Sequence, residues 1–435
     1  MATSGRSLAE RIVAELRSAR KQAYLVGGCV RDLLLGIEPK DYDVATDATP
    51  DQVLKHYPGA LQVGAHFGVI LVRDGDATVE VATFRSDRGY VDGRRPTDVD
   101  FETDPKQDVL RRDFTVNSLL MDPSTGEVLD YTGGRDDLQA GLIRAIGDAE
   151  ERFREDHLRM LRAVRFAARL GFAIEPRTME AIQNLCALVT TVSAERVRDE
   201  LVRILTEGGA RRGFELLDES GLLQIVLPEI AAMKGVEQPP EYHPEGDVWV
   251  HTLIMLDGLG KTTPTLAMGV LLHDVGKPRT FRVAERIRFD GHVEVGVEIT
   301  RKIMTRLRFS NEEIERVEAL VANHMKFAHV HQMKESTLKR MFRLQEFDEH
   351  LELHRLDCES SHRMLQNYEY AKAKREELGK EQIAPPRLLT GRDLIAAGYE
   401  PGPEFGRILD AVEDAQLEGR VRTREEALEL ARQLR

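Results

Sequence analysis

Cysteine is scarce in this chain. Three cysteines occur among 435 residues, at positions 29, 186 and 358, and no two have the Cys-x-x-Cys spacing of thiolate metal sites. So few, widely separated cysteines argue against a thiolate zinc site and indicate a reducing, cytoplasmic location. Long apolar runs are missing too: none reaches the length that spans a bilayer, and residues 1–6 lack the apolar core of a signal peptide. We therefore expect no contact with a membrane.

An excess of positive charge is also absent. The chain has 61 lysines and arginines against 74 aspartates and glutamates, which gives a net charge of −13. That balance does not indicate a nucleic-acid-binding protein, but it excludes none, because such proteins bind through local patches. One short segment carries such a patch, made of Arg152, Arg154, Arg159, Arg162, Arg165 and Arg169. The apolar and charged fractions, 42% and 31%, are those of a soluble globular protein.

The hydrophobic pattern changes near residue 148. Before this point, short β-rich segments alternate with turns and a few helical pieces, at residues 23–26, 41–46, 68–72, 78–83 and 128–130. After it, the periodicity is helical. We therefore predict an α+β fold, in which a mixed sheet with helices precedes an all-α part. The predicted domains are residues 1–147, 148–235, 236–380 and 381–435.

A glycine turn is the first motif that suggests chemistry. Residues 25–32 read Leu-Val-Gly-Gly-Cys-Val-Arg-Asp, and Lys-Asp-Tyr-Asp-Val-Ala-Thr follows at residues 40–46. Gly27 and Gly28 would let the backbone approach a triphosphate closely. Arg31, just after the turn, is a further candidate for binding that nucleotide. The motif therefore predicts a nucleotide site at the N-terminal end of the chain.

Three carboxylates accompany this turn. Asp41 and Asp43 alternate with a tyrosine, so on a strand both would point to one face and could share Mg²⁺ ions. Glu80, in the predicted strand at residues 78–83, would be the third. Nucleotidyl transfer needs such a set, because two metal ions activate the attacking hydroxyl and steady the leaving pyrophosphate. Asp-x-Asp alone proves little, since it recurs at residues 74–76 and 98–100.

An arginine loop follows, reading Arg-Arg-Asp-Phe-Thr-Val-Asn at residues 111–117. Arg111 and Arg112 would bind triphosphate oxygens bidentately. Asp113 belongs to the same predicted nucleotide site, and Asn117 is a candidate for contacting the sugar or the backbone. An acidic surface turn with a solvated charge run is the alternative interpretation of each motif alone. Their order along the chain favours a nucleotidyltransferase core.

The helical pattern after residue 150 offers groups that could read a base. Asp156 and Arg159 are three residues apart, so on a helix they would share a face and present an acceptor beside several donors. Cytosine and adenine show the complementary amino group and ring nitrogen, whereas uracil and guanine would leave buried groups unpaired. Arg162 and Arg165 are further predicted nucleotide contacts. A helix-surface ion pair is the ordinary alternative.

These motifs together resemble the class II tRNA nucleotidyltransferase and bacterial poly(A) polymerase family. The resemblance rests on the segments GGxVRD, DYDVAT, VEVATFR, RRDFTVNSL, DYTGGRDDL and REDHLRMLRAVRFAARLGF, which lie in the family's order between residues 25 and 172. It implies a palm-like head followed by helical neck, body and tail domains. It also implies tRNA as partner, CTP and ATP as substrates chosen by Asp156 and Arg159, and either a monomer or a homodimer.

Residues 85–101 bear on which reaction is carried out. This segment resembles the flexible loop of CCA-adding enzymes, which lets the pocket change from CTP to ATP, whereas enzymes that add only two cytidines are shortened there. Poly(A) polymerases of the family typically carry a different insertion and a basic C-terminal tail. The tail here mixes charges of both signs. We expect CCA addition, with addition of the final adenosine alone, or of poly(A), as alternatives.

Histidine is concentrated in the second half, with ten of 13 between residues 243 and 362. Some recur with aspartates in the order of HD-type metal phosphohydrolases. Such a ligand set suits a transition metal such as Ni²⁺ or Mn²⁺. The predicted metal ligands are His251, His273, Asp274 and Asp357. A second metal position or a phosphate contact is predicted for Lys277, His292 and His324.

The resemblance extends to this half, since HD domains fused to CCA-adding enzymes are linked to 2′,3′-cyclic phosphodiesterase and phosphatase activity. We therefore expect a phosphohydrolase as a second activity, and a retained fold without activity is the alternative. Two other classes of protein are alternatives for the whole chain. One is an HD phosphohydrolase whose head only docks RNA, and the other is a non-catalytic RNA-binding protein. The carboxylates at positions 41, 43 and 80 speak against both.

Overall fold

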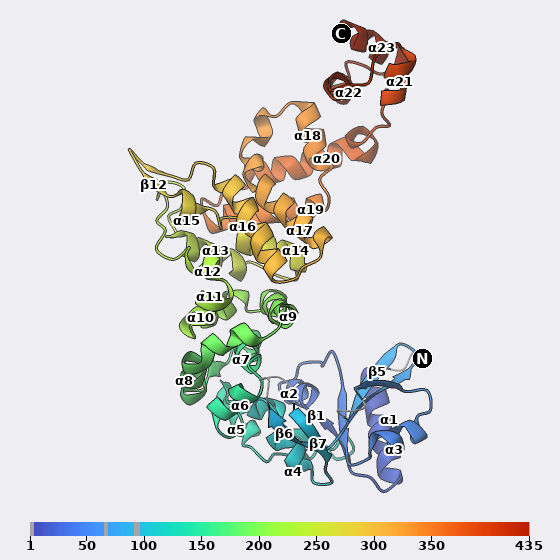
Figure 1. Ribbon diagram of the computed structural model, residues 1–435, viewed down its shortest axis with the longest axis vertical. Helices are drawn as coiled ribbons and strands as arrows, with labels where there is room; N and C mark the ends of the chain where they lie inside the picture. Colours follow the sequence, from blue (N-terminus) through green and yellow to red (C-terminus); the bar gives the residue numbers. More distant parts are fainter. Residues whose placement is uncertain (1–3, 65–67, 91–95, 435) are drawn as a thin grey trace. The chain divides into compact units, whose positions relative to one another are not determined.

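The computed structural model of the protein describes residues 4–64, 68–90 and 96–434. Its chain separates into two units, Met1–Ala231 and Ala232–Arg435 (Figure 1). The first contains a mixed sheet and helices, and the second is almost wholly helical. The predicted α+β fold is thus confirmed. The division lies four residues from the boundary predicted at 235, while the boundaries at 147 and 380 stay predictions.

A seven-stranded sheet forms the centre of the first unit, in the order β3-β4-β5-β2-β1-β8-β9. Only β2 and β5 pair in parallel, which makes the sheet mixed. Buried apolar side chains such as Val44, Ala45 and Val81 line these strands. The strands are β1 (Ala23–Val26), β2 (Asp43–Thr46), β3 (Leu61–Gly64), β4 (Val69–Asp74), β5 (Ala77–Thr83), β8 (Leu120–Met121) and β9 (Val128–Leu129).

A separate hairpin lies within residues 85–101, the segment that resembles a flexible loop. Its strands β6 (Arg85–Tyr90) and β7 (Pro96–Phe101) pair antiparallel. The tip, residues 91–95, lies outside the described residues. A side-chain contact connects the hairpin with the arginine loop, because Asp87 Oδ2 lies 3.9 Å from Arg111 Nη1.

Helices surround and follow the sheet of the first unit. Their capping residues explain several starts: Ser4 and Thr49 form capping boxes, and Asp104 and Asp148 accept from backbone amides of the first turn. The helices are α1 (Gly5–Ser18), α2 (Gly28–Leu34), α3 (Pro50–His56), α4 (Pro105–Leu110), η2 (Thr115–Asn117), α5 (Gly134–Ala140), α6 (Ala149–Glu155), α7 (Arg159–Leu170), α8 (Pro176–Leu185), η3 (Cys186–Thr191), α9 (Ala194–Thr206), α10 (Ala210–Glu219), α11 (Leu222–Val226) and α12 (Pro228–Ala231). A short parallel pair joins β10 (Leu142–Ile143) to β11 (Ala173–Ile174).

The second unit is built around two apolar helices, α13 (Val248–Asp257) and α14 (Pro264–Leu272). Both are buried along most of their length, as all-round apolar helices require. The other elements are α15 (Lys277–Thr280), β12 (Arg282–Val283), β13 (Ile287–Arg288), α16 (His292–Arg306), α17 (Asn311–Asn323), η4 (His324–Gln332), α18 (Glu335–Phe342), α19 (Phe347–Ser360), α20 (Gln366–Ile383), α21 (Gly391–Ala396), α22 (Glu404–Leu417) and α23 (Arg424–Gln433). None of the helices within residues 4–64, 68–90 and 96–434 has the length and apolar character needed to cross a membrane.

Candidate functional site

The carboxylates of the head meet at the first residue of β2. Asp43 begins this strand and stands directly opposite Glu80 of β5 in the parallel register. Asp41 precedes the strand, so the prediction that both aspartates lie on it is wrong in that detail. Exposure still alternates, because Tyr42 is buried between exposed Asp41 and half-buried Asp43. The three carboxylates therefore gather at one end of the parallel strand pair.

Charge crowding at this point raises the pKa of Asp43. Burial and the neighbouring Glu80 raise the pKa of Asp43 to about 6, Asp41 adds to the rise, and Arg112 opposes it. Carboxylates held close together repel one another unless a cation lies between them. The donor set, three carboxylates of hard oxygen atoms, fits Mg²⁺.

Glycine is required at the turn after β1. Gly27 has a φ of 78° and precedes α2. A Cβ there would lie 3.3 Å from Arg112 Nη1, so a side chain would push against the guanidinium. Arg112 and Arg111 are both held by the buried carboxylate of Asp108, at 2.9 and 2.5 Å. Asp108, which the sequence analysis did not single out, thus fixes both predicted triphosphate ligands.

A buried polar network connects α2 with α7. Arg31 donates to Asp32 Oδ1 at 2.6 Å and to Asn117 Oδ1 at 2.5 Å. Asn117 donates to Asp113 at 3.2 Å, and Arg162 of α7 donates to the other oxygen of Asp113 at 2.6 Å. Of these residues, all but Asp32 were predicted to contact nucleotide. The structure pairs them with one another and makes them the frame of the site.

The network has a second branch at Asp32. Its Oδ2 accepts from Arg169 Nη2 of α7 at 3.1 Å, while Oδ1 is held by Arg31. The Asp32 carboxylate is almost fully buried, and so is the Arg31 side chain. A single carboxylate therefore joins a helix of the sheet region to a helix that comes 137 residues later.

Asp156 and Arg159 do not share a helix. Asp156 is the C-cap of α6 and Arg159 is the first residue of α7, so the single helix predicted for this stretch is broken between them. Asp156 Oδ2 binds Arg196 of α9 at 2.8 Å. Arg159 binds Glu155 at 2.6 Å and donates to the carbonyl of Arg111 at 2.9 Å. Both candidate base readers are thus held by internal partners.

Arg165 is held by internal partners as well. Its guanidinium is buried and bonds Glu200 of α9 at 2.6 Å, with Glu207 at 3.4 Å. It also covers the ring of Phe166 at 4.2 Å. This geometry gives Arg165 a role in helix packing, and the predicted nucleotide contact stays a prediction.

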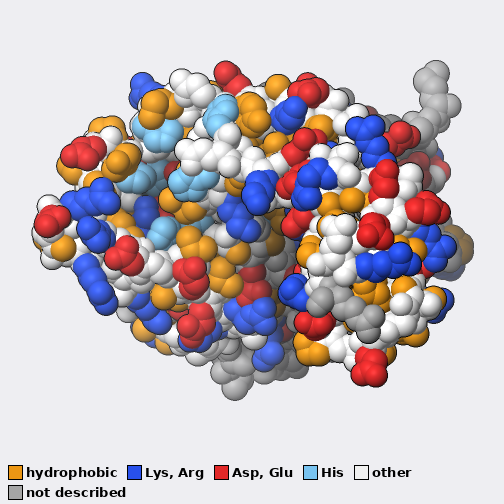
Figure 2. Space-filling view, turned by 90° about the horizontal axis from the view of Figure 1, so that it is seen from above, with side chains coloured by type: hydrophobic (Ala, Val, Ile, Leu, Met, Phe, Trp, Pro, Cys, Tyr) orange, Lys and Arg blue, Asp and Glu red, His pale blue; other side chains and the backbone are white. Residues whose placement is uncertain are grey.

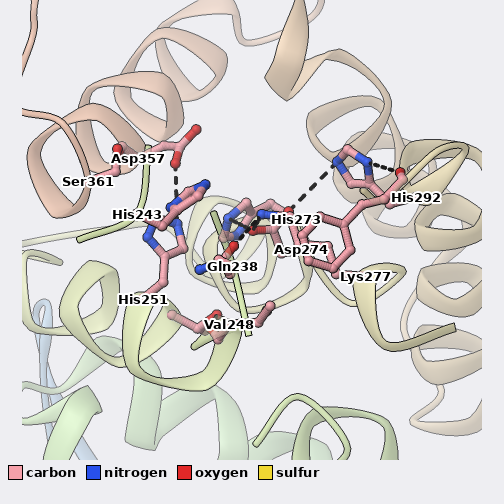
Figure 3. A network of polar contacts seen from close by, with 12 residues as sticks. Gln238, His243, Val248, His251, His273, Asp274, Lys277, His292, Asp357 and Ser361 are labelled. Carbon is pink, nitrogen blue, oxygen red and sulfur yellow. Dashed lines mark hydrogen bonds and ion pairs between the residues drawn. The ribbon is translucent and has the colours of Figure 1, made fainter. Parts of the chain in front are cut away.

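The predicted HD residues converge in the second unit (Figure 3). Most of them lie at helix ends, since His273 follows α14, His292 begins α16 and His324 follows α17. His251 comes from α13 and Asp357 from α19. Two groups of three have all their candidate ligand atoms within 4.8 Å of one another: His251, His273 and Asp357 in the first, Asp274, His292 and His324 in the second. The three carboxylates of the head do not form such a group.

Three of these imidazoles are oriented in the same way. In His273, His292 and His324, Nδ1 lies 2.7–3.0 Å from the carbonyl oxygen three residues earlier. Donation from Nδ1 leaves the lone pair on Nε2. All three Nε2 atoms are buried; those of His292 and His324 have no hydrogen-bond partner, whereas that of His273 lies 3.1 Å from Asp274 Oδ2. Such second-shell bonds are what fix metal-ligating histidines, so the residues fit a metal ion.

Asp274 lies between the two groups. Its Oδ2 is 3.1 Å from His273 Nε2 and 2.7 Å from Lys277 Nζ, while its Oδ1 is 3.8 Å from Nε2 of both His292 and His324. The carboxylate therefore presents one oxygen to each side. Although it is buried, the charges of His273 and Lys277 hold the pKa of Asp274 well below its usual value. Its geometry suits a carboxylate that bridges two ions.

The protonation states of His292, His324 and Asp357 agree with metal binding, whereas His251 would have to lose a proton. Burial opposes the charge of His251, but its hydrogen bonds to Asp357 and Glu245 outweigh burial and raise its pKa to about 9. Burial, together with the charge of His273, lowers the pKa of His324 to about 4, and burial also lowers that of His292. Burial opposes ionisation of Asp357, but the hydrogen bond from His251 outweighs it and lowers the pKa of Asp357. Neutral imidazoles and ionised carboxylates are the forms that ligate metals.

Three residues near these histidines, namely Gln238, His243 and Glu245, were missed by sequence reasoning. Glu245 lies 2.7 Å from Nδ1 of His251 and 2.9 Å from Nδ1 of His243. Gln238 accepts from Lys277 Nζ at 2.7 Å. All three precede α13 in the loop around residues 235–246. Glu245, six residues before His251, was the signal available in the sequence. No helical or strand periodicity relates Glu245 to His251, however.

Comparison with protein-family models assigns most of the chain. Residues 23–144 match a model described as the poly A polymerase head domain. Residues 171–234 match one for an RNA- and SrmB-binding site of polymerase A, and residues 292–431 match tRNA nucleotidyltransferase domain 2. None of these three models describes an HD domain, so the HD interpretation of residues 236–380 stays a prediction.

Known proteins give a consistent result. The CC-adding tRNA nucleotidyltransferase of Thermus thermophilus is 36% identical over 422 residues, which cover 94% of this chain and 92% of that protein. The CCA-adding enzymes of Lactobacillus johnsonii and Geobacillus stearothermophilus are 37% and 43% identical. The matched part spans 56% and 51% of this chain, and 62% and 54% of those enzymes.

Among solved structures, the Bacillus stearothermophilus CCA-adding enzyme in complex with CTP is 26% identical with a TM-score of 0.75. The match covers 99% of this chain and 98% of that one. The Thermotoga maritima CCA-adding enzyme complexed with tRNA is 20% identical with a TM-score of 0.58, covering 98% and 95%, and it supports the fold alone.

Proposed function

Because this chain belongs to the tRNA nucleotidyltransferase and poly(A) polymerase family, we propose that it builds or repairs the 3′-terminal CCA of tRNA from CTP and ATP without a nucleic-acid template. The observation that carries the proposal is the parallel register that places Asp43 opposite Glu80, with Asp41 beside them. We assign this reaction to the cytoplasm, where tRNA is matured.

The head residues divide the work. Asp41, Asp43 and Glu80 would hold Mg²⁺, which activates the attacking 3′-hydroxyl and steadies the leaving pyrophosphate. Arg111 and Arg112 remain the candidates for the triphosphate, because Asp108 holds their guanidinium groups beside the Gly27 turn. The hydrogen-bond network around Arg31 would hold these groups in place.

We propose that the two residues at the break between α6 and α7 select the base. Asp156 would accept from the amino group of cytosine or adenine, and Arg159 would donate to the adjacent ring nitrogen. Both must first leave internal partners, namely Arg196 and Glu155. Nucleotide binding therefore exchanges one set of charge-assisted hydrogen bonds for another, which penalises a base that cannot complete the set.

The choice between CC and CCA addition depends on the β6–β7 hairpin. One relative with near-complete coverage is a CC-adding tRNA nucleotidyltransferase, so similarity alone does not decide the product. The hairpin spans residues 85–101 and contacts the arginine loop through Asp87 and Arg111. We propose that it allows the change from CTP to ATP.

The deciding experiment is incubation of tRNA lacking CCA with CTP alone, ATP alone and both together. Sequencing of the product 3′ ends should show CC with CTP and CCA with both. Deleting residues 90–97 should stop the reaction at CC. A product of CC in wild type would identify a CC-adding enzyme, and long adenosine runs would identify a poly(A) polymerase.

A second function is favoured by the histidine cluster, which consists of His251, His273, Asp274, Lys277, His292, His324 and Asp357. We propose that His251, His273, Asp274 and Asp357 hold a transition metal such as Ni²⁺ or Mn²⁺, with His292 and His324 completing a second position. A divalent cation there would polarise a phosphate ester and activate water for hydrolysis. Lys277, held between Asp274 and Gln238, would meet a phosphate oxygen. The favoured substrate is a 2′,3′-cyclic phosphate, which blocks the end that the head extends.

Hydrolysis of 2′,3′-cyclic AMP with Ni²⁺, Mn²⁺ or Mg²⁺ tests this second function. Metal-stimulated turnover is expected. Its absence with every metal would show that the cluster is a structural remnant of an HD domain.

A further inference from the structure

A hairpin projects from the helices of the second unit next to α15 (Figure 1). Its strands β12 and β13 are paired antiparallel, and the hairpin begins after α15 and ends before α16. Lys277 begins α15 and His292 begins α16, so the hairpin lies in the segment that connects two residues of the cluster.

One side of this hairpin is positively charged. Arg282 and Arg288 are directly opposite each other in the register, so both side chains leave the same face. Arg286 lies in the turn. All three side chains are exposed, and none forms an ion pair with any residue in the described parts of the chain. Like charges directly opposite each other destabilise a strand pair, which an anionic ligand would relieve.

The hairpin is packed onto the cluster through aromatic residues. Phe281 and Phe289, which flank its strands, have ring centroids 6.0 Å apart. The Phe289 ring lies under Lys277 Nζ at 5.2 Å, and its carbonyl accepts from His292 Nδ1 at 3.0 Å. Phe281 is 37% exposed and Val283 is 71% exposed. The base of the hairpin therefore contacts two residues of the cluster, while its tip offers charge and apolar surface to solvent.

We propose that this hairpin binds the ribose-phosphate backbone next to the 3′ end of an RNA and guides its terminal phosphate to the histidine cluster. The proposal rests on the phosphohydrolase function proposed above, and it names the substrate as a polynucleotide. A mononucleotide has a single phosphate, which Lys277 and the cluster can hold, and it leaves the three arginines unused. Exposed Phe281 offers a ring on which a base can stack. Figure 2 shows histidine side chains gathered on one face, with lysine and arginine side chains beside them.

The test compares two substrates in a variant carrying Arg282→Gln, Arg286→Gln and Arg288→Gln. The KM for tRNA ending in a 2′,3′-cyclic phosphate should rise about ten-fold. The slope of log KM against log salt concentration should fall by about 2, because three phosphate contacts are lost on a single strand. Turnover of 2′,3′-cyclic AMP should stay unchanged. A control variant removes three exposed cations from the head instead, through Arg20→Gln, Lys55→Gln and Arg73→Gln.

Equal KM values for the tRNA substrate in wild type, hairpin variant and control would overturn the proposal. If neither substrate is hydrolysed by wild type, the phosphohydrolase function fails, and a measurement without turnover decides on the hairpin. An RNA carrying 4-thiouridine next to its 3′ end should then cross-link to the peptide of residues 279–291, and the hairpin variant should lose this cross-link. Cross-linking elsewhere only would refute RNA binding by the hairpin.

Discussion

The two candidate sites differ in how much of their chemistry is assembled before any ligand binds. In the head, Asp41 and Glu80 are exposed, and the two predicted base readers are bound to internal partners. In the histidine cluster, imidazoles and carboxylates are already grouped, and buried Nε2 atoms point inward. The proposed nucleotide site would accept two different nucleotides in turn and would need adjustable contacts, whereas the proposed metal-dependent hydrolase site would depend on fixed ones.

The largest effect should follow from removing a head carboxylate. Asp43→Ala should reduce nucleotide addition by roughly 10³-fold or more, because the charge that develops on the transferred phosphate loses its stabilisation. Hydrolysis of 2′,3′-cyclic AMP should persist. Asp76→Ala, which changes an exposed aspartate of another Asp-x-Asp pair, is the matched control for primer-extension assays. Near-normal addition by Asp43→Ala would contradict the two-metal assignment, and the same holds for Asp41→Ala.

Replacing two residues of the histidine cluster should abolish hydrolysis and leave nucleotide addition intact. His273→Ala combined with Asp274→Ala should reduce metal-stimulated hydrolysis to background and remove bound Ni²⁺ or Mn²⁺, as measured by elemental analysis. Nucleotide addition by the head reports whether the variant is folded. Unchanged metal content in a folded variant would show that these residues are not the ligands.

Replacing a base reader should have an intermediate effect. Asp156→Ala or Arg159→Ala should cost about 1–3 kcal/mol of discrimination against UTP and GTP, the value of one hydrogen-bonded edge. Single-nucleotide incorporation measures this selectivity. Arg154→Ala, an exposed arginine of α6 that pairs with Glu150, serves as control. Selectivity equal to wild type in the Asp156 and Arg159 variants would transfer base recognition to other residues.

A smaller effect should come from the glycine between Asp274 and His292. A Cβ at Gly276 would lie 2.1 Å from the carbonyl oxygen of His292, so Gly276→Ala must move α16 away. We expect hydrolysis to fall about ten-fold, since a displaced ligand misaligns the site. Addition by the head should not change. Gly260→Ala, which meets no atom within 4 Å, is the control. Full hydrolysis by Gly276→Ala would show that the position of His292 is not critical.

Sequence alone predicted the strands at residues 23–26 and 78–83 closely, because alternation and turn residues mark them locally. The convergence of His251, His273 and Asp357 was also predicted, and the structure brings these residues together. The break between Asp156 and Arg159 was missed, because a spacing of three residues fits a continuous helix equally well.

The ion-pair partner of Arg165 could not be predicted, for a different reason. Its position on the arginine face of α7 depends on Glu200, which lies 35 residues later in the chain. Glu245 and Gln238 were missed because loop residues have no periodicity that relates them to the cluster. Long-range partners of charged side chains are the part of this site that one sequence does not reveal.

The forked carboxylate of Asp32 has a consequence for the order in which the chain folds during synthesis. Arg31 is available on one side at once, but Arg169 is translated 137 residues later. Until α7 has left the ribosome, the sheet region would bury Asp32 and Asp113 with part of their charge unbalanced. The sheet therefore completes its fold only together with α7. A fragment ending at residue 147 lacks that helix, which agrees with a first unit that extends to Ala231.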